Sequence, residues 1–394
     1  MSYHFYPPLP DVSSILVMRP NAIGDFMFAL PALHALRHTY PKARIVFLGK
    51  LWHADFLHNR PSPVDEVIVM PPVPGVGAPH DAGVDPEPGR RFAAAIRKEK
   101  FDIAAQMYGG GRYSNPYLLQ FGAKLTIGMK TSDAMPLDRW TSHGEKTNRR
   151  LELLQVAALV GAAPPLLSQE IAVTPQDRRE AAALIPYSEG ERLVILHPGA
   201  SEVRRRWPPE RFAAVADTLA NKGAVIVISA TEEDRHLSST IVGHMHHDAI
   251  DLTGKLPLSA LCGLLERAVM IVANDTGPLH LALSIGTPSV GIFWLTNLLE
   301  SCPLRQDLLQ AGLSVRLHCP VCDAVNHNSR CEHDVCFVDD VTVEEVTGKA
   351  MELFDQGCSM RPAKGKPVRK PHAFDRLRGP RRSGAVAGRE VPSG

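Results

Sequence analysis

Three residues that could bind an anion, and an aspartate beside them, stand close together between positions 275 and 280. They are Asp275, Thr276, Gly277 and His280, and they follow an apolar run at 270–273 that is typical of a buried strand. Thr276 is a good N-cap for a helix that starts with Gly-Pro, and the free N–H groups of a helix N-terminus attract phosphate. A capped core helix with an incidental histidine is the alternative. The convergence of these residue types on one helix end favours a phosphate site.

A second group of residues could grip the same anion. The strand predicted at 192–197 ends at His197, the small residues 198–201 follow, and three arginines occupy 204–206. Arginine can hold two phosphate oxygens at once through its planar guanidinium. The alternative is a solvated basic turn before the next helix.

A carboxylate is available for acid–base chemistry near the N-terminus. Gly24 tightens the turn after the first predicted strand, and Asp25 stands at the start of the next helix. An aspartate there most often caps the helix. The functional interpretation makes it a general base, because a carboxylate can take a proton from a hydroxyl within about 3 Å.

Strands and helices alternate along both halves of the chain, which predicts an α/β protein with parallel sheets. We expect two doubly wound, Rossmann-like domains whose strand ends face each other across a cleft, where ligands of such folds bind. The predicted divisions are an N-terminal domain at 1–163, a linker at 164–177, a C-terminal domain at 178–355 with a Cys-rich segment at 318–336, and a tail at 356–394.

Together these motifs resemble glycosyltransferase family 9, the ADP-heptose:lipopolysaccharide heptosyltransferases. The likeness rests on Asn-Asp-Thr-Gly-Pro-x-His at 274–280, on His-Pro-Gly-Ala-Ser at 197–201 before Arg-x-Trp-Pro, and on the Gly-Asp segment at 24–25. It runs from about residue 14 to 350. It implies the GT-B architecture and an inverting, metal-independent transfer of heptose from an ADP-activated donor to a lipopolysaccharide-core-type saccharide.

The resemblance also implies roles for individual residues. Asp25 matches the proposed base, and the donor diphosphate would lie at Thr276, Gly277 and His280, with Asp275 close by. The remaining donor contacts would be Ser201 and Arg205 at the phosphates, Glu232 near the ribose or adenosine, and Leu256 beside the adenine. The family usually has lysine where this chain has Arg205, and the turn before Asp25 reads Asn-Ala-Ile-Gly, so the acceptor contacts at Gly24 differ from the usual pattern.

Basic residues in the first half could meet an anionic, phosphorylated acceptor. Arg112 follows a predicted strand, and Lys146, Arg149 and Arg150 precede the helix that leads to the linker. Solvated surface charge is the alternative.

The Cys-rich segment could bind a metal. Cys319 and Cys322 are separated by two residues, and Cys331 and Cys336 by four, which gives four thiolates for a tetrahedral structural zinc. His318, His327 and His333 are competing ligands. Free thiols and a disulfide-stapled loop are the alternatives, and no cofactor is expected to be required for catalysis.

The ends of the chain suggest where the protein works. The first residues lack a basic start followed by an apolar core, which predicts a cytoplasmic protein. Residues 361–394 hold ten Lys and Arg against two acidic residues, and we expect a disordered tail. Such a tail is either simply solvated or drawn to anionic lipid or nucleic acid. For the whole protein we expect peripheral association with the inner membrane, a lipid-linked saccharide acceptor and no nucleic-acid partner.

Two other functions fit the same architecture. One is a nucleotide-sugar epimerase or hydrolase, which needs no acceptor. The other is a non-catalytic nucleotide-sugar-binding protein, in which replacing Asp25 with alanine would leave ligand binding and biological activity intact.

Overall fold

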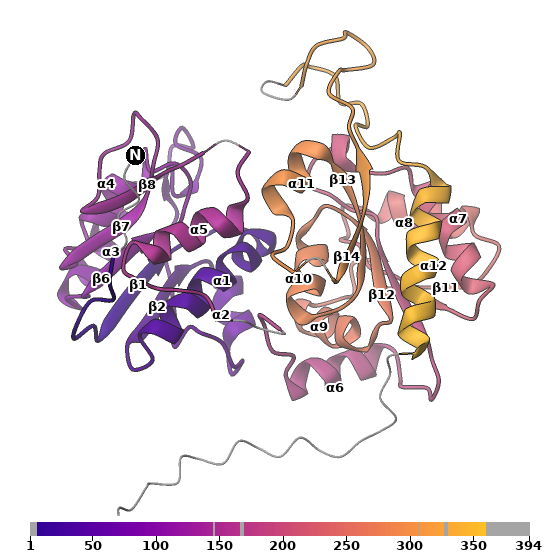
Figure 1. Cartoon of the computed structure of the whole chain (residues 1–394), viewed down its shortest axis with the longest axis horizontal. Helices are drawn as coiled ribbons and strands as arrows, with labels where there is room; N and C mark the ends of the chain where they lie inside the picture. The colour runs from indigo at the N-terminus through magenta and orange to yellow at the C-terminus, as the bar shows by residue number, and fades with distance from the viewer. Residues whose placement is uncertain (1–5, 145, 166–168, 306, 327–329, 360–394) are drawn as a thin grey trace, which may run out of the picture.

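The computed structural model describes residues 6–359 apart from 145, 166–168, 306 and 327–329, and two lobes lie side by side in it (Figure 1). Each lobe is built on a six-stranded parallel sheet. The predicted tail at 356–394 and the candidate ligand His327 therefore fall wholly or mostly outside the described residues.

The first sheet has the order β3-β2-β1-β6-β7-β8. Its strands are β1 (Ser14–Met18), β2 (Arg44–Gly49), β3 (Glu66–Val69), β6 (Ile103–Gln106), β7 (Leu125–Lys130) and β8 (Arg139–Ser142). The helices of this lobe are α1 (Ile23–Thr39), α2 (Leu51–Leu57), α3 (Glu87–Lys98), α4 (Ser114–Leu119) and α5 (Arg149–Ala158), and a small pair of strands joins β4 (Val73–Pro74) to β5 (Gly77–Ala78).

The second sheet repeats this topology in the order β11-β10-β9-β12-β13-β14. Its strands are β9 (Leu193–His197), β10 (Val225–Ile228), β11 (Ala249–Asp251), β12 (Met270–Asn274), β13 (Ser289–Trp294) and β14 (Leu309–Ser314). Its helices are α6 (Pro175–Leu184), the 3₁₀ turn η1 (Val203–Arg205), α7 (Pro209–Ala220), α8 (Arg235–His244), α9 (Leu258–Arg267), α10 (Gly277–Ile285), α11 (Leu295–Ser301) and α12 (Val343–Ser359).

The strand order confirms the predicted fold of two doubly wound domains. In each parallel sheet, successive strands are added first toward one edge and then toward the other. The order switches between β1 and β6 in one lobe and between β9 and β12 in the other. Ligands of such folds bind beyond the carboxyl ends of these strands. β9 and β12 are buried along their whole length, as strands covered by helices on both faces must be.

The two lobes share a core. The largest cluster of buried apolar residues runs continuously from α1 of the first lobe to α10 of the second. A buried ion pair lies at the same interface, where Arg60 binds Asp177 at the start of α6 through Nη1–Oδ2 and Nη2–Oδ1 distances of 2.6 and 2.9 Å. The domain limits deduced from the sequence stay a prediction, and α6 begins at Pro175, inside the predicted linker.

Candidate active site

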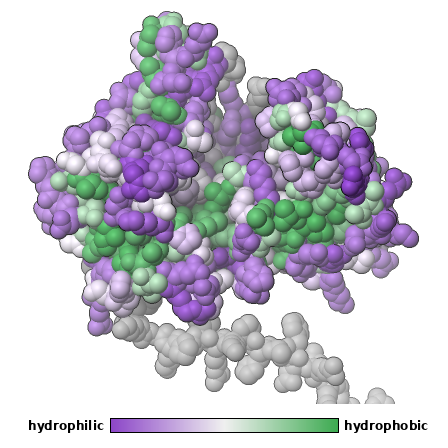
Figure 2. Space-filling model, turned by 180° about the vertical axis from the view of Figure 1, so that it is seen from behind, coloured by the Kyte–Doolittle hydropathy of each residue, from purple (hydrophilic) through white to green (hydrophobic). Residues whose placement is uncertain are grey.

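A cleft of about 660 Å³ lies between the lobes at the carboxyl ends of the central strands. Figure 2 shows the surface hollowed between the two lobes, with hydrophilic residues around the hollow. Most of the residues singled out in the sequence line this cleft: Gly24, Asp25, Arg149, Ser201, Arg205, Asp275, Thr276, Gly277 and His280.

The N-terminus of α10 opens into the cleft. Thr276 is the N-cap residue with extended backbone, as expected, but its side chain makes no capping hydrogen bond. The N–H groups of the first turn are therefore left for a ligand, and Pro278 in that turn has no N–H to lose. Gly286 ends the helix in the left-handed conformation (φ 99°), which glycine adopts without strain.

Asp275 connects two residues that the sequence placed near the donor diphosphate, His280 and Arg205. Its Oδ1 accepts hydrogen bonds from His280 Nε2 (2.9 Å) and from Ser301 Oγ (3.0 Å), while its Oδ2 lies 3.1 Å from Arg205 Nη1. Arg205 also donates from Nη2 to Ser201 Oγ at 2.9 Å. The carboxylate thus orients the groups around it and has little capacity left for a ligand.

The charges of this network follow from burial and pairing. Burial alone would raise the pKa of Asp275, but the hydrogen bond from His280 and the charge of Arg205 hold the pKa below its ordinary value. Burial lowers the pKa of His280 despite the carboxylate beside it. A neutral His280 donates its Nε2 hydrogen to Asp275, which leaves Nδ1 unprotonated, and this buried atom has no hydrogen-bond partner among the described residues.

Asp25 approaches the same place from the other lobe. It is the third residue of α1, and the N-cap of this helix is Ala22. Asp25 therefore does not cap the helix, which was the alternative to a catalytic role. Arg19, which is buried, donates from Nη2 to Asp25 Oδ1 at 3.1 Å and from Nε to the Asp25 carbonyl at 2.8 Å. The Asp25 side chain itself is 38% exposed in the cleft. Arg19 therefore fixes one carboxylate oxygen and leaves the other available.

The first turns of α1 and α10 are in contact. A Cβ atom built on Gly24 would lie 3.5 Å from Gly277 Cα and 3.6 Å from His280 Cδ2. A Cβ on Gly277 would lie 2.3 Å from Ile23 Cγ2, which is too close for any side chain. Glycine at 277 is required for this approach, and it brings Asp25 next to the N-terminus of α10.

Several predicted residues do not line the cleft. Glu232 is exposed and forms an ion pair with Arg235, although its neighbours Thr231 and Glu233 line the cleft. Leu256 is half-buried against the large core cluster. The roles inferred for Glu232 and Leu256 stay predictions.

The basic acceptor candidates are found in three different environments. Arg149 lines the cleft and reaches across it, with Nη2 lying 3.1 Å from Glu300 Oε2 of the other lobe. Arg112 lines a separate hollow of about 310 Å³ with residues 109–111 and His143. Arg150 is only 1% exposed and donates to the carbonyl oxygens of Ser301 and Cys302. The structure therefore gives Arg150 a packing contact in place of the expected exposed position.

The sequence interpretation missed Arg19, which holds Asp25 from behind the cleft surface, and two residues of the cleft lining. Arg19 was missed because nothing in its local pattern separates it from a surface arginine. His197 and Asp234 also line the cleft, and burial lowers the pKa of His197 to about 4. Asp234 lies 3.1 Å from Arg206 Nη2. His197 is the last residue of β9, and this position at a strand end was its available signal; Asp234 is the N-cap residue of α8, in the loop after β10.

The Cys-rich segment brings together a set of ligands different from the one predicted. Cys319, Cys322, Cys331 and His333 have their ligand atoms within 4.8 Å of one another. Cys336, expected as the fourth ligand, points elsewhere and donates from Sγ to the Arg206 carbonyl at 3.0 Å. The prediction of Cys336 was wrong because the loop shape, and not the spacing of cysteines, decides which side chains converge.

The sequence profile of glycosyltransferase family 9 (heptosyltransferase) matches residues 89–327. The chain belongs to this family. It is 25% identical over 297 residues to lipopolysaccharide heptosyltransferase 2 of Salmonella typhimurium, an alignment that covers 71% of this chain and 82% of the relative.

Solved structures agree on the fold of this family 9 member. A family 9 glycosyltransferase from Veillonella parvula superposes with a TM-score of 0.72 at 21% identity, covering 87% of this chain and 97% of that one. The ADP-heptose lipopolysaccharide heptosyltransferase II of E. coli gives 0.67 at 20% identity, covering 87% and 99%. The chain is thus a glycosyltransferase with the GT-B architecture.

Proposed function

We propose that this enzyme transfers heptose, with inversion, from an ADP-activated donor to a saccharide of the lipopolysaccharide-core type. The observation that carries the proposal is the contact of the α1 and α10 N-termini, which joins a half-exposed carboxylate to an open phosphate site. The names of the Salmonella relative and the E. coli structure support heptose and ADP.

In the proposed reaction, Asp25 takes the proton of the acceptor hydroxyl while its oxygen attacks the anomeric carbon of the donor. The bond from that carbon to the diphosphate breaks on the opposite face, and ADP leaves. The N–H groups of α10, the helix dipole and Arg205 stabilise the charge that develops on the leaving diphosphate. A single displacement of this kind inverts the anomeric configuration.

We propose that the transfer needs no metal ion. The groups that could stabilise the diphosphate in place of a metal are Arg205 and Arg206, which Asp275 and Asp234 hold in position, and the α10 N-terminus. Among the described residues, the cluster of potential metal ligands is found at 319–333 and does not line the cleft. We expect an unchanged rate of transfer when a chelator removes free metal ions from the assay but does not remove metal that is bound to the protein.

The acceptor side is the less defined half of the proposal. Arg149 supports an anionic acceptor because it is a basic acceptor candidate that lines the cleft, together with Gly24. No helix among the described residues is long and apolar enough to cross a membrane. We propose that the enzyme meets a lipid-linked acceptor by peripheral association with the cytoplasmic face of the inner membrane, which co-sedimentation with anionic vesicles would test.

The experiment compares the unaltered enzyme with Asp25→Asn, using Asp81→Asn, an exposed aspartate of the same lobe, as the matched control. Expected are unchanged ADP affinity and a loss of transfer of about 10²–10⁴-fold in Asp25→Asn alone. Equal ADP release with and without acceptor would favour a hydrolase. Transfer that survives in Asp25→Asn would refute the role of the carboxylate.

A further inference from the structure

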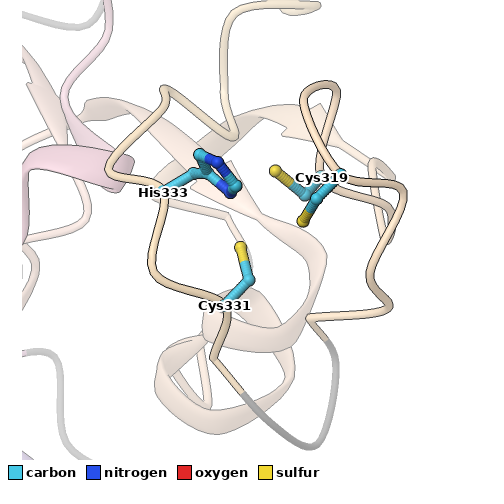
Figure 3. A group of neighbouring side chains, drawn as sticks. Cys319, Cys331 and His333 are labelled. Atoms are coloured by element: carbon cyan, nitrogen blue, oxygen red, sulfur yellow. The ribbon is translucent and has the colours of Figure 1, made fainter.

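We propose that Cys319, Cys322, Cys331 and His333 bind one zinc ion, and that the metal braces the turn that presents Arg205 to the donor. Figure 3 shows the side chains of Cys331 and His333 directed toward Cys319. These four residues are called the Cys₃His cluster below.

The dimensions of the Cys₃His cluster suit a tetrahedral metal. Its four ligand atoms all lie within 4.8 Å of one another. Zinc–sulfur bonds of about 2.3 Å correspond to a tetrahedron with edges of about 3.8 Å, so binding needs only a small contraction. No disulfide joins the cysteines of the part of the chain that the structure describes, which leaves the thiols free as ligands.

The backbone around Cys319 and Cys322 is shaped to hold thiolates. The Val321 N–H donates to Cys319 Sγ at 3.4 Å, and such a bond stabilises a negatively charged sulfur. Asp323 turns the chain in the left-handed region (φ 57°), and its N–H donates to the Cys319 carbonyl at 2.9 Å. This tight turn directs both cysteines to one side.

A separate observation points to a missing ligand at His333. Its Nδ1 atom is buried and has no hydrogen-bond partner among the described residues. Burying such a nitrogen without a partner costs free energy. A metal ion at the centre of the Cys₃His cluster would remove this cost by coordinating the imidazole.

Contacts lead from the Cys₃His cluster to the donor site. Asn326 lies between the two halves of the cluster, and its Oδ1 accepts from the Cys331 N–H at 3.0 Å and from Arg204 Nη2. Arg204 is 2% exposed, and its guanidinium stacks 4.3 Å from the centre of the Phe337 ring. Asn326, within the loop 319–333, thus holds Arg204, the arginine that precedes Arg205.

Two further contacts attach the same turn. The Phe337 N–H donates to the Arg204 carbonyl at 2.8 Å, and Cys336 Sγ donates to the Arg206 carbonyl at 3.0 Å. Between these anchors, Arg205 projects to Asp275 and Ser201 in the cleft. Zinc would hold the loop 319–333 in place, and through Arg204 it would fix the position of Arg205.

The metal is tested first on the unaltered full-length protein, purified without chelators. Elemental analysis is expected to find one zinc per chain, and X-ray absorption at the zinc edge is expected to find three sulfur ligands and one nitrogen. Absence of metal, iron in place of zinc, or four sulfur ligands would overturn the assignment. This test does not depend on any variant being able to fold.

Variants then test the ligand set. Cys322→Ser and His333→Ala should each lose the zinc, whereas Cys336→Ser should keep it, since a serine hydroxyl can still donate to the Arg206 carbonyl. Loss of zinc in Cys336→Ser, or its retention in Cys322→Ser, would overturn the ligand set.

The bracing role rests on the proposed donor site and is read from ADP affinity. Zinc-free Cys322→Ser is expected to bind ADP about tenfold more weakly than Cys336→Ser, because Arg205 loses its fixed position. Equal affinities would refute the bracing. If the unaltered protein binds zinc but no ADP, the donor proposal fails while the metal site stands.

Discussion

The carboxylate of Asp275 holds His280 with one oxygen and Arg205 with the other, at 2.9 and 3.1 Å. These two residues come from different elements, the helix α10 and the turn η1, so Asp275 sets their separation at the proposed donor-phosphate site. Because the carboxylate is 4% exposed, its neighbours and not water satisfy its charge.

Replacing Asp275 with asparagine keeps the shape but removes the charge. We expect ADP affinity to fall about tenfold and the free energy of unfolding to fall by about 2 kcal/mol, because hydrogen bonds to charged groups are worth about 1.5–3 kcal/mol. Calorimetry with ADP and denaturant unfolding measure the two effects. Asp248→Asn, at an exposed aspartate of the same lobe, should change neither. Unaltered ADP affinity in Asp275→Asn would contradict the positioning role.

Arg205→Lys tests whether geometry or charge matters at this position. The guanidinium contacts Asp275 through Nη1 and Ser201 through Nη2, and a single ammonium cannot reproduce this fork. We expect ADP affinity to fall several-fold in Arg205→Lys and by about 10–100-fold in Arg205→Ala. Titration with ADP measures both variants beside Arg179→Lys, at an exposed arginine of α6 whose side chain contacts Gln176. Equal losses in the lysine and alanine variants would show that the fork, and not the charge, is decisive.

The ion pair between Arg60 and Asp177 is buried at the junction of the lobes, with both side chains at most 3% exposed. Arg60→Met should lower the free energy of unfolding by about 3–5 kcal/mol, because it leaves Asp177 charged and unpaired. Adding Asp177→Asn should recover part of this loss, since an amide keeps a cap for α6 without the charge. Arg178→Met, which breaks an exposed pair with Glu266, should cost about 1 kcal/mol or less. Thermal unfolding ranks the variants, and a double variant less stable than Arg60→Met would refute the explanation.

His53 makes stability depend on pH. Its side chain is fully buried, Nδ1 accepts from the Lys50 N–H at 2.9 Å, and burial lowers its pKa to about 3 from the ordinary 6.5. The unfolded chain therefore binds more protons between pH 6.5 and 3, so this contribution is complete above pH 6.5 and is lost as the pH falls. We expect a loss of about 2 kcal/mol at pH 5 relative to pH 8.

The measurement for His53 is denaturant unfolding of the unaltered protein and of His53→Gln at pH 5 and 8. The variant should lose less stability on acidification. His58→Gln, at an exposed histidine five residues later, should behave as the unaltered protein does. An equal pH response in all three proteins would exclude His53 as the cause.

The sequence was most informative where a polar motif directly follows an apolar strand. Asp275 after β12 and Ser201 after β9 were predicted together because neighbouring parallel strands deliver their carboxyl ends to one edge. The strands β7, β8 and β14 were not predicted. β8 and β14 are edge strands, where burial and hence the apolar signal are weaker, whereas β7 is mostly buried but its sequence mixes Thr, Gly and Lys into the apolar run.

Contacts between distant segments could not be predicted from the sequence. Arg150 reads as a surface residue but is buried against the carbonyl end of α11. His333, and not Cys336, joins the cluster of potential metal ligands, while Cys336 donates to the carbonyl of Arg206, far away in the sequence. Such choices depend on packing, which local composition does not encode.

The meeting of Gly24 and Gly277 has a mechanical consequence. Because the Ile23 side chain packs against Gly277 and one buried core runs through both lobes, the two helix ends resist being pulled apart. Asp25 and the N-terminus of α10 are therefore preset at a short separation, and any side chain introduced at residue 277 would wedge the two helices apart.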